Sequence, residues 1–329
     1  MKDLNKLTHF LGMRITYGDG TISLDQTVYI RQVLERFRMQ ECSPVSTPLA
    51  TGCRLVKGSK DVSNMNNKLY QAIVGSLMYA MLCTRPDLAY PIQQLSQFNS
   101  DPTNAHFQAA KRALRYLQGS QAKRLIYSKC NGEIMKPIQA YCDADHAADS
   151  DRKSISGYVF TLAGSAISWQ AKKQTTVAQS TVEAEYAAMA HAAKEMIWLQ
   201  YLLKDLGMSK YSPTILFCDN QGAISLAKNP THHAKTKHVD VQLHFIRDHI
   251  DKGTIDVKYC PTDDMLADIM TKGLARERHE MLVKRMGIGV QKVGIITPSS
   301  SEADGQRTVG STSGSVELRG ILRGIHAGR

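Results

Sequence analysis

The chain has 329 residues and a formal net charge of +11, with 41 Lys and Arg against 30 Asp and Glu. This length fits about two ordinary domains, and the basic excess favours a polyanionic partner without naming it. The sequence has no apolar run long enough for a transmembrane helix, no signal-peptide core at its start, and seven cysteines without a close pair. We therefore expect an intracellular protein, cytoplasmic or nuclear, with free thiols and no membrane partner.

The first 130 residues predict a small α+β region that carries much of the basic excess. An Asp-Gly turn between two apolar runs indicates a β-hairpin, and apolar stripes at helical spacing indicate helices. A Ser-, Pro-, Gly- and Asn-rich stretch indicates a loop. In chain order these elements are the hairpin at 10–25, a helix at 26–38, the loop at 43–65, and helices at 66–83 and 104–118.

One face of the helix at 104–118 is basic, because Lys111, Arg112 and Arg115 lie opposite its apolar side. Such a row can contact nucleic-acid phosphates without reading the base sequence. A solvated helix face explains the same pattern equally well. The sequence alone does not separate these two explanations.

Residues 136–286 predict a mixed α/β layer fold. Three extended runs rich in β-branched and aromatic residues come first, and a long helix follows, with Ser180 and Glu183 as a capping box. Shorter strands and helices then alternate. The strands are expected at 137–143, 156–162, 166–172, 214–218 and 255–259, and the helices at 180–206, 221–228, 239–251 and 264–272. Residues 287–329 are Ser-, Thr- and Gly-rich, and we expect a disordered tail there.

Four acidic residues stand at the ends of these predicted elements. Asp143 ends the first strand, and Glu185 begins the buried stripe of the long helix. Asp219 follows the strand at 214–218, and Asp268 lies in the last short helix. Each has an ordinary explanation by itself, such as a helix cap or an i,i+4 ion pair.

Together, these four acids have one common explanation. Strand ends and a helix start can bring the carboxylates together beside the sheet, where they repel one another and are costly to bury without cations. Oxygen ligands suit Mg²⁺ or Mn²⁺. Two such ions can hold the attacking water and the leaving oxygen of a phosphodiester. The sequence therefore favours a two-metal site.

Nine stretches of the chain occur in an order that is known from one family. They are FLGMRI at 10–15, VGSLMYAMLCTRPDLAY at 74–90, HFQAAKRALRYLQGS at 106–120, YCDADHAAD at 141–149, SISGYVFTLAGSAISWQAKKQ at 154–174, STVEAEYAAMAHAAKEMIWL at 180–199, CDNQGAISLAKNP at 218–230, TKHVDVQLHFIRD at 236–248 and DMLADIMTK at 264–272. They resemble the C-terminal part of the Pol polyprotein of copia-type LTR retrotransposons. The resemblance covers about residues 1–286.

The resemblance implies a ribonuclease H-like mixed sheet with flanking helices at 136–286. A smaller α+β remnant of the reverse transcriptase, thumb- or connection-like, would precede it at 1–130. The implied enzyme is an endonuclease that cuts the RNA strand of an RNA–DNA hybrid with two Mg²⁺ or Mn²⁺ ions. Its catalytic metal ligands correspond to Asp143, Glu185, Asp219 and Asp268. Asp145 is a weaker alternative to Asp143, because we expect it to lie beyond the end of the strand.

The family's polymerase site carries two adjacent aspartates, and the single Asp-Asp pair here, at 263–264, lies in the ribonuclease H part. We therefore expect a chain that begins after the polymerase palm, makes no DNA alone, and joins the upstream polymerase part in an intact Pol protein. His146 stands where the family usually has Trp, and we interpret it as a packing substitute. The main alternative function is a catalytically idle remnant that still binds nucleic acid. A different nuclease of the same fold is the more remote alternative. Integrases use acids in the order Asp, Asp, Glu, whereas this chain has Asp, Glu, Asp, Asp, and exonucleases of the fold commonly begin with Asp-x-Glu, which Asp143-Ala144-Asp145 does not match.

Overall fold

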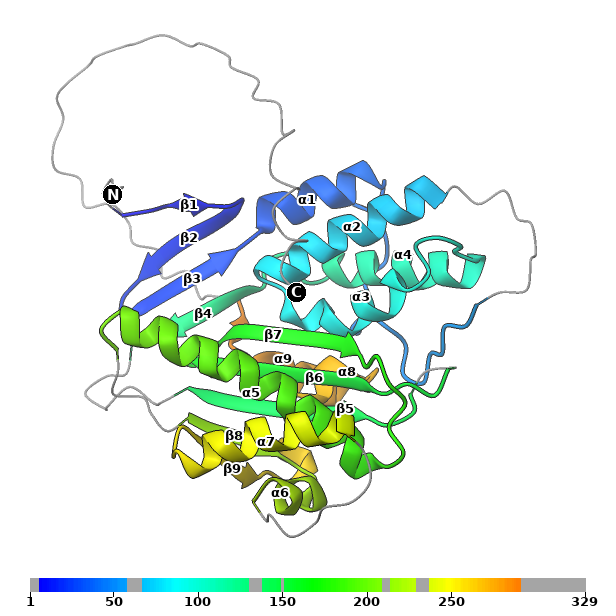
Figure 1. Cartoon of the computed structure of the whole chain (residues 1–329). Coiled ribbons are helices and arrows are strands. Elements are labelled where there is room, and N and C mark those ends of the chain that lie inside the picture. Colours follow the sequence, from blue (N-terminus) through cyan, green and yellow to red (C-terminus); the bar gives the residue numbers. More distant parts are fainter. Residues whose placement is uncertain are drawn as a thin grey trace, which may run out of the picture. The chain divides into compact units, whose positions relative to one another are not determined.

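The computed structural model describes residues 6–57, 67–129, 138–148, 151–208, 214–228 and 237–290 (Figure 1). All of them belong to one compact unit, Met1–Gln291. A second unit, Lys292–Arg329, lies outside the described residues. The predicted boundary between 1–130 and 136–286 falls on residues 130–137, which are also outside them, so this division stays a prediction.

The first sheet is antiparallel, with the strand order β1-β2-β3-β4-β10. Its strands are β1 (His9–Phe10), β2 (Met13–Gly18), β3 (Thr21–Asp25), β4 (Arg124–Ser128) and β10 (Ile288–Gly289). β2 and β3 confirm the predicted hairpin, and Gly20 takes the positive φ, +62°, that its turn requires. β10 corrects the expected tail from 287: the apolar Ile288 is buried and pairs with Leu125 of β4.

Helices α1 (Thr27–Arg36), α2 (Asn67–Cys83) and α4 (Asn104–Gln118) confirm the three helices that the apolar stripes predict. The short η1 (Pro86–Leu88) and α3 (Ala89–Ser96) were not predicted. At η1, Asp87 forms a fully buried ion pair with the preceding Arg85, with 2.7 Å between guanidinium and carboxylate. Tyr116 of α4 donates its hydroxyl to the same carboxylate, at 2.5 Å. This pair links α4 to the end of α2.

The second sheet has the strand order β7-β6-β5-β8-β9 and confirms the predicted mixed sheet (Figure 1). Its strands are β5 (Gln139–Asp145), β6 (Ile155–Leu162), β7 (Ser165–Lys173), β8 (Thr214–Cys218) and β9 (Ile255–Tyr259). β6 runs antiparallel to both β5 and β7, whereas β8 runs parallel to both β5 and β9. The strand order therefore reverses between β5 and β8, the place where ligands bind in open α/β sheets.

Helices cover both faces of the second sheet. α5 (Thr181–Asp205), α6 (Gln221–Lys228) and α7 (Lys237–Asp251) contribute to the core on one face. α8 (Asp268–Thr271) and α9 (Arg276–Arg285) contribute to the core on the other. Alternate β5 residues serve the two cores, Ala140 and Cys142 toward α5 and Tyr141 toward α8.

The predicted helix at 264–272 is only partly right. The chain forms a 3₁₀ turn, η3 (Thr262–Asp264), and the single-turn α8 instead of one continuous helix. α8 lies very close to β6, because a Cβ added at Gly157 would stand 2.5 Å from Met270 Cβ and 2.8 Å from Thr271 Cγ2. Glycine at 157 therefore permits the position of α8.

Side chains also connect the helices of the first part to β7. The Trp169 indole N–H donates to the Met81 carbonyl at 3.1 Å, and Lys173 donates to the Gln97 amide oxygen at 3.0 Å. These contacts explain why the described residues form one unit. Among the described helices, none is both long enough and apolar enough to cross a membrane.

Candidate metal centre

The structure brings together all four carboxylates that the sequence singles out. Asp143 lies near the end of β5, Glu185 in the first turns of α5, Asp219 directly after β8, and Asp268 at the start of α8. Three are buried, with Asp143 1%, Glu185 6% and Asp268 4% exposed, and Asp219 is half-buried. The charges of Asp268 and Asp219 act to raise the pKa of Asp143, and those of Asp143 and Asp219 act to raise the pKa of Glu185.

The start of α5 determines which of its two glutamates faces the sheet. Ser180 caps the helix and accepts the Glu183 backbone N–H at 3.2 Å. The Glu183 carboxylate accepts the Gln179 backbone N–H at 2.8 Å. Glu183 therefore lies at the helix start as predicted, but the second bond of the expected capping box goes to Gln179 instead of Ser180. Glu185, two residues later, is turned into the buried face.

Asp143 is a buried carboxyl with two donors. Its Oδ2 accepts the Thr271 hydroxyl, and the Lys272 ammonium lies 3.3 Å from Oδ2 and 3.4 Å from Oδ1. Burial raises the pKa of Asp143 to about 6, and the nearby charges of Asp268 and Asp219 add to this rise, although Lys272 and Thr271 oppose it. Lys272 alone therefore does not offset the cost of burying Asp143 in its ionised form.

Lys272 bridges two members of the cluster. Its ammonium lies 2.9 Å from Asp268 Oδ1 as well as beside Asp143. The guanidinium of Arg278 contacts the other Asp268 oxygen at 3.0 Å. The Lys272 ammonium thus lies between the carboxylates of Asp143 and Asp268, where a positive charge reduces their repulsion.

The other half of the cluster contains a carboxylate oxygen without a partner. Glu185 Oε2 is buried and has no hydrogen-bond partner in the described part of the chain. Burial raises the pKa of Glu185 to about 10, helped by the negative charges of Asp143 and Asp219. Asp219, by contrast, accepts the Thr262 hydroxyl at 2.8 Å. Carboxylate oxygens and an orphaned buried acceptor fit a hard divalent cation such as Mg²⁺ or Mn²⁺.

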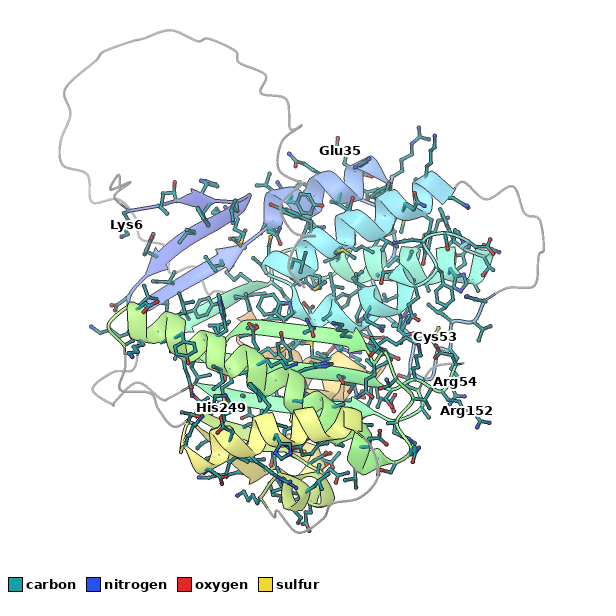
Figure 2. All side chains as sticks on the ribbon, in the orientation of Figure 1. Lys6, Glu35, Cys53, Arg54, Arg152 and His249 are labelled. Atoms are coloured by element: carbon teal, nitrogen blue, oxygen red, sulfur yellow. The ribbon has the colours of Figure 1, made fainter. Side chains whose placement is uncertain are left out.

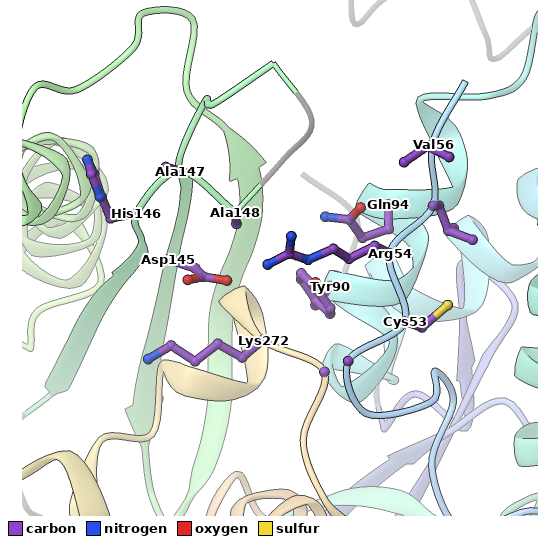
Figure 3. Close-up of a pocket in the computed structure, with 13 residues that line it drawn as sticks. Cys53, Arg54, Val56, Tyr90, Gln94, Asp145, His146, Ala147, Ala148 and Lys272 are labelled. Carbon is purple, nitrogen blue, oxygen red and sulfur yellow. The ribbon is translucent and has the colours of Figure 1, made fainter. Parts of the chain in front are cut away.

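Asp145 corrects one expectation, because β5 continues through this residue instead of ending before it. Its side chain lines a cavity of about 370 Å³ next to the carboxylate cluster (Figure 3). Burial raises the pKa of Asp145, while Lys272 and Arg54 lower it. His146, on the same wall, approaches the Ala178 carbonyl with Nε2 at 3.2 Å. This contact links His146 to the segment before α5, and the packing role that we expect for His146 stays a prediction.

The basic face of α4 makes contacts within the chain. Arg115 donates to the Ser43 carbonyl at 2.7 Å, and Arg112 donates to the Thr47 hydroxyl at 2.9 Å. The Lys111 ammonium lies 5.1 Å from the centre of the Phe107 ring. Both guanidinium groups thus hold the loop at 43–47 against α4. A nucleic-acid role for these three residues stays a prediction.

A different cation lies nearer the carboxylate cluster. Arg54 is exposed and projects from its loop (Figure 2). In the cavity it faces Asp145, and Gln94 of α3 lies beside it (Figure 3). Sequence reasoning missed Arg54, because a loop residue without periodicity gives no signal before the fold is known.

Several of the known proteins that the chain resembles are Pol polyproteins of transposons. The chain is 43% identical over 296 residues to the retrovirus-related Pol polyprotein from transposon TNT 1-94 of Nicotiana tabacum, covering 88% of this chain and 22% of that protein. It is 38% identical over 291 residues to the Pol polyprotein from transposon RE1 of Arabidopsis thaliana, covering 88% and 19%. The chain therefore spans about a fifth of the length of these relatives.

Among solved structures, the chain is similar to LC11-RNase H1, isolated from compost. The two are 14% identical with a TM-score of 0.33, over 45% of this chain and 99% of that chain. No family model matches the chain.

Proposed function

Because the chain belongs to the copia-type retrotransposon Pol polyproteins, we propose that it is a metal-dependent ribonuclease H that cuts the RNA strand of RNA–DNA hybrids. The observation that carries the proposal is the convergence of four carboxylates at the carboxyl ends of β5 and β8 of a ribonuclease H-like sheet. The chain covers only part of its relatives, so the proposal rests on this centre and not on what a whole Pol protein does.

Asp143, Glu185, Asp219 and Asp268 would hold the metal ions through their carboxylate oxygens. When bound there, two Mg²⁺ or Mn²⁺ ions would supply an activated water and positive charge near the departing 3′ oxygen. The carboxylates themselves need no other chemical role, so no protein nucleophile is required. Burial, and after it the charges of the neighbouring acids, raise the pKa values of Asp143 and Glu185, and bound cations would offset both effects.

Neighbouring side chains hold these ligands in place. Thr271 donates to Asp143, Thr262 donates to Asp219, and Arg278 contacts Asp268. Hydrogen bonds of this kind orient metal ligands before a metal arrives. Lys272 supplies part of the missing positive charge and would move aside when ions bind Asp143 and Asp268.

The cavity beside the cluster offers a place for the hybrid backbone. Arg54 and Gln94 lie on its wall and can donate hydrogen bonds to phosphate oxygens. Such contacts position a nucleic acid without reading its bases. Recognition of the hybrid would then rest on its A-like shape and on the 2′-hydroxyls of the RNA strand. In an intact Pol protein, the upstream polymerase part would supply that hybrid.

The test is cleavage of an RNA–DNA hybrid, labelled on the RNA strand, in Mg²⁺ and in Mn²⁺. Asp219→Asn removes one proposed ligand, and Asp248→Asn, on the exposed surface of α7, is the matched control. We expect Asp219→Asn to lower the rate at least about 100-fold, because even hydrogen-bond partners of metal ligands are worth about 10–100-fold. The control should cut at the wild-type rate.

Folded wild-type protein that binds hybrid in a salt-dependent manner but does not cut it would refute the proposal. That result would favour the alternative of a catalytically idle remnant. Equal cleavage by wild type and Asp219→Asn would show that Asp219 is not one of the metal ligands.

A further inference from the structure

One end of the carboxylate cluster also carries a thiol. Glu185, Cys218 and Asp219 each offer a ligand atom, and these atoms all lie within 4.8 Å of one another. Cys218 is fully buried and free of any disulfide. The sulfur is additional to the four carboxylates that the proposed nuclease uses.

The fold fixes this sulfur in position. Cys218 is the last residue of β8 and joins the core on the α5 side of the sheet, the side from which Glu185 approaches. Its Sγ accepts the backbone N–H of Asn220 at 3.4 Å. Asn220 in turn accepts the Ala223 backbone N–H at 2.9 Å and so caps α6. The turn after β8 therefore holds the sulfur beside the two carboxylates.

A second observation points to a ligand at this place. Glu185 is 6% exposed, and its Oε2 has no hydrogen-bond partner among the described residues. The neighbouring Cys142 directs its own thiol to the Phe217 carbonyl, at 3.5 Å. Glu185 thus keeps an oxygen without a partner in the group where its carboxylate, Asp219 and the Cys218 sulfur meet, and a cation there would satisfy that oxygen.

We propose that Glu185, Cys218 and Asp219 form a mixed carboxylate–thiolate site for a borderline-soft divalent cation of the Zn²⁺ class, and that such an ion blocks the centre. Sulfur favours Zn²⁺ over the hard Mg²⁺, and Zn²⁺ also binds more tightly than Mn²⁺ at a given site. When the ion binds, a sulfur–metal bond replaces the S–H bond of Cys218, and a metal–oxygen bond replaces the O–H bond of Glu185, which burial keeps protonated. Both protons pass to solvent. Water completes the coordination.

The distances are compatible with such an ion. Zn²⁺ lies about 2.3 Å from sulfur and about 2.0–2.2 Å from oxygen, so tetrahedral donors stand about 3.5 Å apart. The three donor atoms lie within 4.8 Å, and closing that gap needs about 1 Å of side-chain movement. The binding half of the inference stands by itself, whereas the blocking half rests on the proposed nuclease function.

The test of binding is titration of the full chain with Cd²⁺ or Co²⁺, with a phosphine reductant that keeps the thiols free. Sulfur bonded to these ions gives a near-ultraviolet charge-transfer band, which carboxylates alone do not. We expect Cys218→Ser to lose the band of the tightest site and to weaken Zn²⁺ binding at least about tenfold. Cys83→Ser, at the end of α2, is the matched control and should keep both. Glu185→Gln should weaken binding while keeping the thiol.

The test of blocking is Zn²⁺ inhibition of Mg²⁺-dependent hybrid cleavage, with each protein compared with its own rate in Mg²⁺. We expect Cys218→Ser to need at least about tenfold more Zn²⁺ for the same fractional inhibition. Cys218→Ala serves in its place if the serine variant does not fold.

Two results would overturn the site: a folded wild type without a charge-transfer band, or a band that Cys218→Ser and Cys83→Ser reduce equally. If the band depends on Cys218 but no protein cuts hybrid, the site stands and the nuclease function fails. If wild type cuts hybrid but shows no band and no Zn²⁺ inhibition, the site alone fails.

Discussion

Replacing Asp143 by Asn should stabilise the metal-free protein while abolishing cleavage. The Asp143 side chain is almost fully buried, and burial raises its pKa to about 6 from an ordinary value of 3.8. Asn has nearly the same shape, keeps an oxygen that can accept the Thr271 hydroxyl, and carries no charge to bury. The variant should therefore lose an electrostatic cost along with a metal ligand.

The size of this effect follows from the two pKa values. The folded protein binds the Asp143 proton more tightly than the unfolded chain does, so ionisation of Asp143 lowers stability as pH rises. The cost begins above pH 3.8 and is complete above the folded pKa of about 6. The difference between these values corresponds to about 3 kcal/mol. At pH 8 the variant avoids this cost, and at pH 4 there is almost none to avoid.

Urea unfolding in EDTA measures the difference directly. We expect Asp143→Asn to be more stable than wild type by about 2–3 kcal/mol at pH 8 and equally stable at pH 4. Asp248→Asn, an exposed carboxyl on α7, should show no such gain. Added Mn²⁺ should then stabilise wild type but not Asp143→Asn. A variant that is less stable than wild type in EDTA at pH 8, by more than about 1 kcal/mol, would refute the reasoning.

Three further changes test other parts of the account. Lys272→Met should lower the stability of the metal-free protein by about 1–2 kcal/mol, less than for a fully buried ion pair because the Lys272 side chain is 34% exposed. Calorimetry should also show a larger Mn²⁺-induced rise in the melting temperature of this variant. An unchanged stability of the metal-free variant would count against the role of Lys272 as a counter-ion. Asp87→Asn should cost about 3–5 kcal/mol in urea unfolding because it leaves the buried charge of Arg85 without its counter-ion, and a cost below about 1 kcal/mol would contradict that. Gly157→Ala should cost about 1–3 kcal/mol, since the new methyl would stand 2.5 Å from Met270 Cβ. It should also weaken Mn²⁺ binding in titration calorimetry by displacing α8, and wild-type Mn²⁺ affinity in this variant would be evidence against the role of α8.

Regular patterns made much of the second sheet predictable. Runs rich in β-branched and aromatic residues indicated β5, β6 and β7, and the Ser180 cap placed the start of α5. Three of the four carboxylates follow from strand ends and that helix start, because such positions share one edge of a sheet. The short α8 was predicted too long, and α3 and α9 were missed, since brief helices show little periodicity.

The contacts that tune the centre could not be predicted in the same way. Lys272 and Asp143 are 129 residues apart in the chain and meet only when α8 lies on β6. In the sequence, Cys218 looks like an ordinary buried strand residue, and its neighbour Glu185 comes from another element. The contacts of Arg112 and Arg115 with the loop at 43–47 are likewise absent from the sequence pattern, which shows only a basic helix face. Such pairings depend on the tertiary fold and not on local spacing.

The central claim is that the four carboxylates form a working metal centre for hydrolysis of RNA in a hybrid. The most direct measurement follows an RNA–DNA hybrid, labelled on both strands, with the full chain in Mg²⁺, in Mn²⁺ and in EDTA. We predict that the RNA strand is cut in the two metals, that the DNA strand stays whole, and that EDTA stops the reaction. RNA cleavage that continues in EDTA, or a folded protein that leaves both strands whole in both metals, would contradict the account.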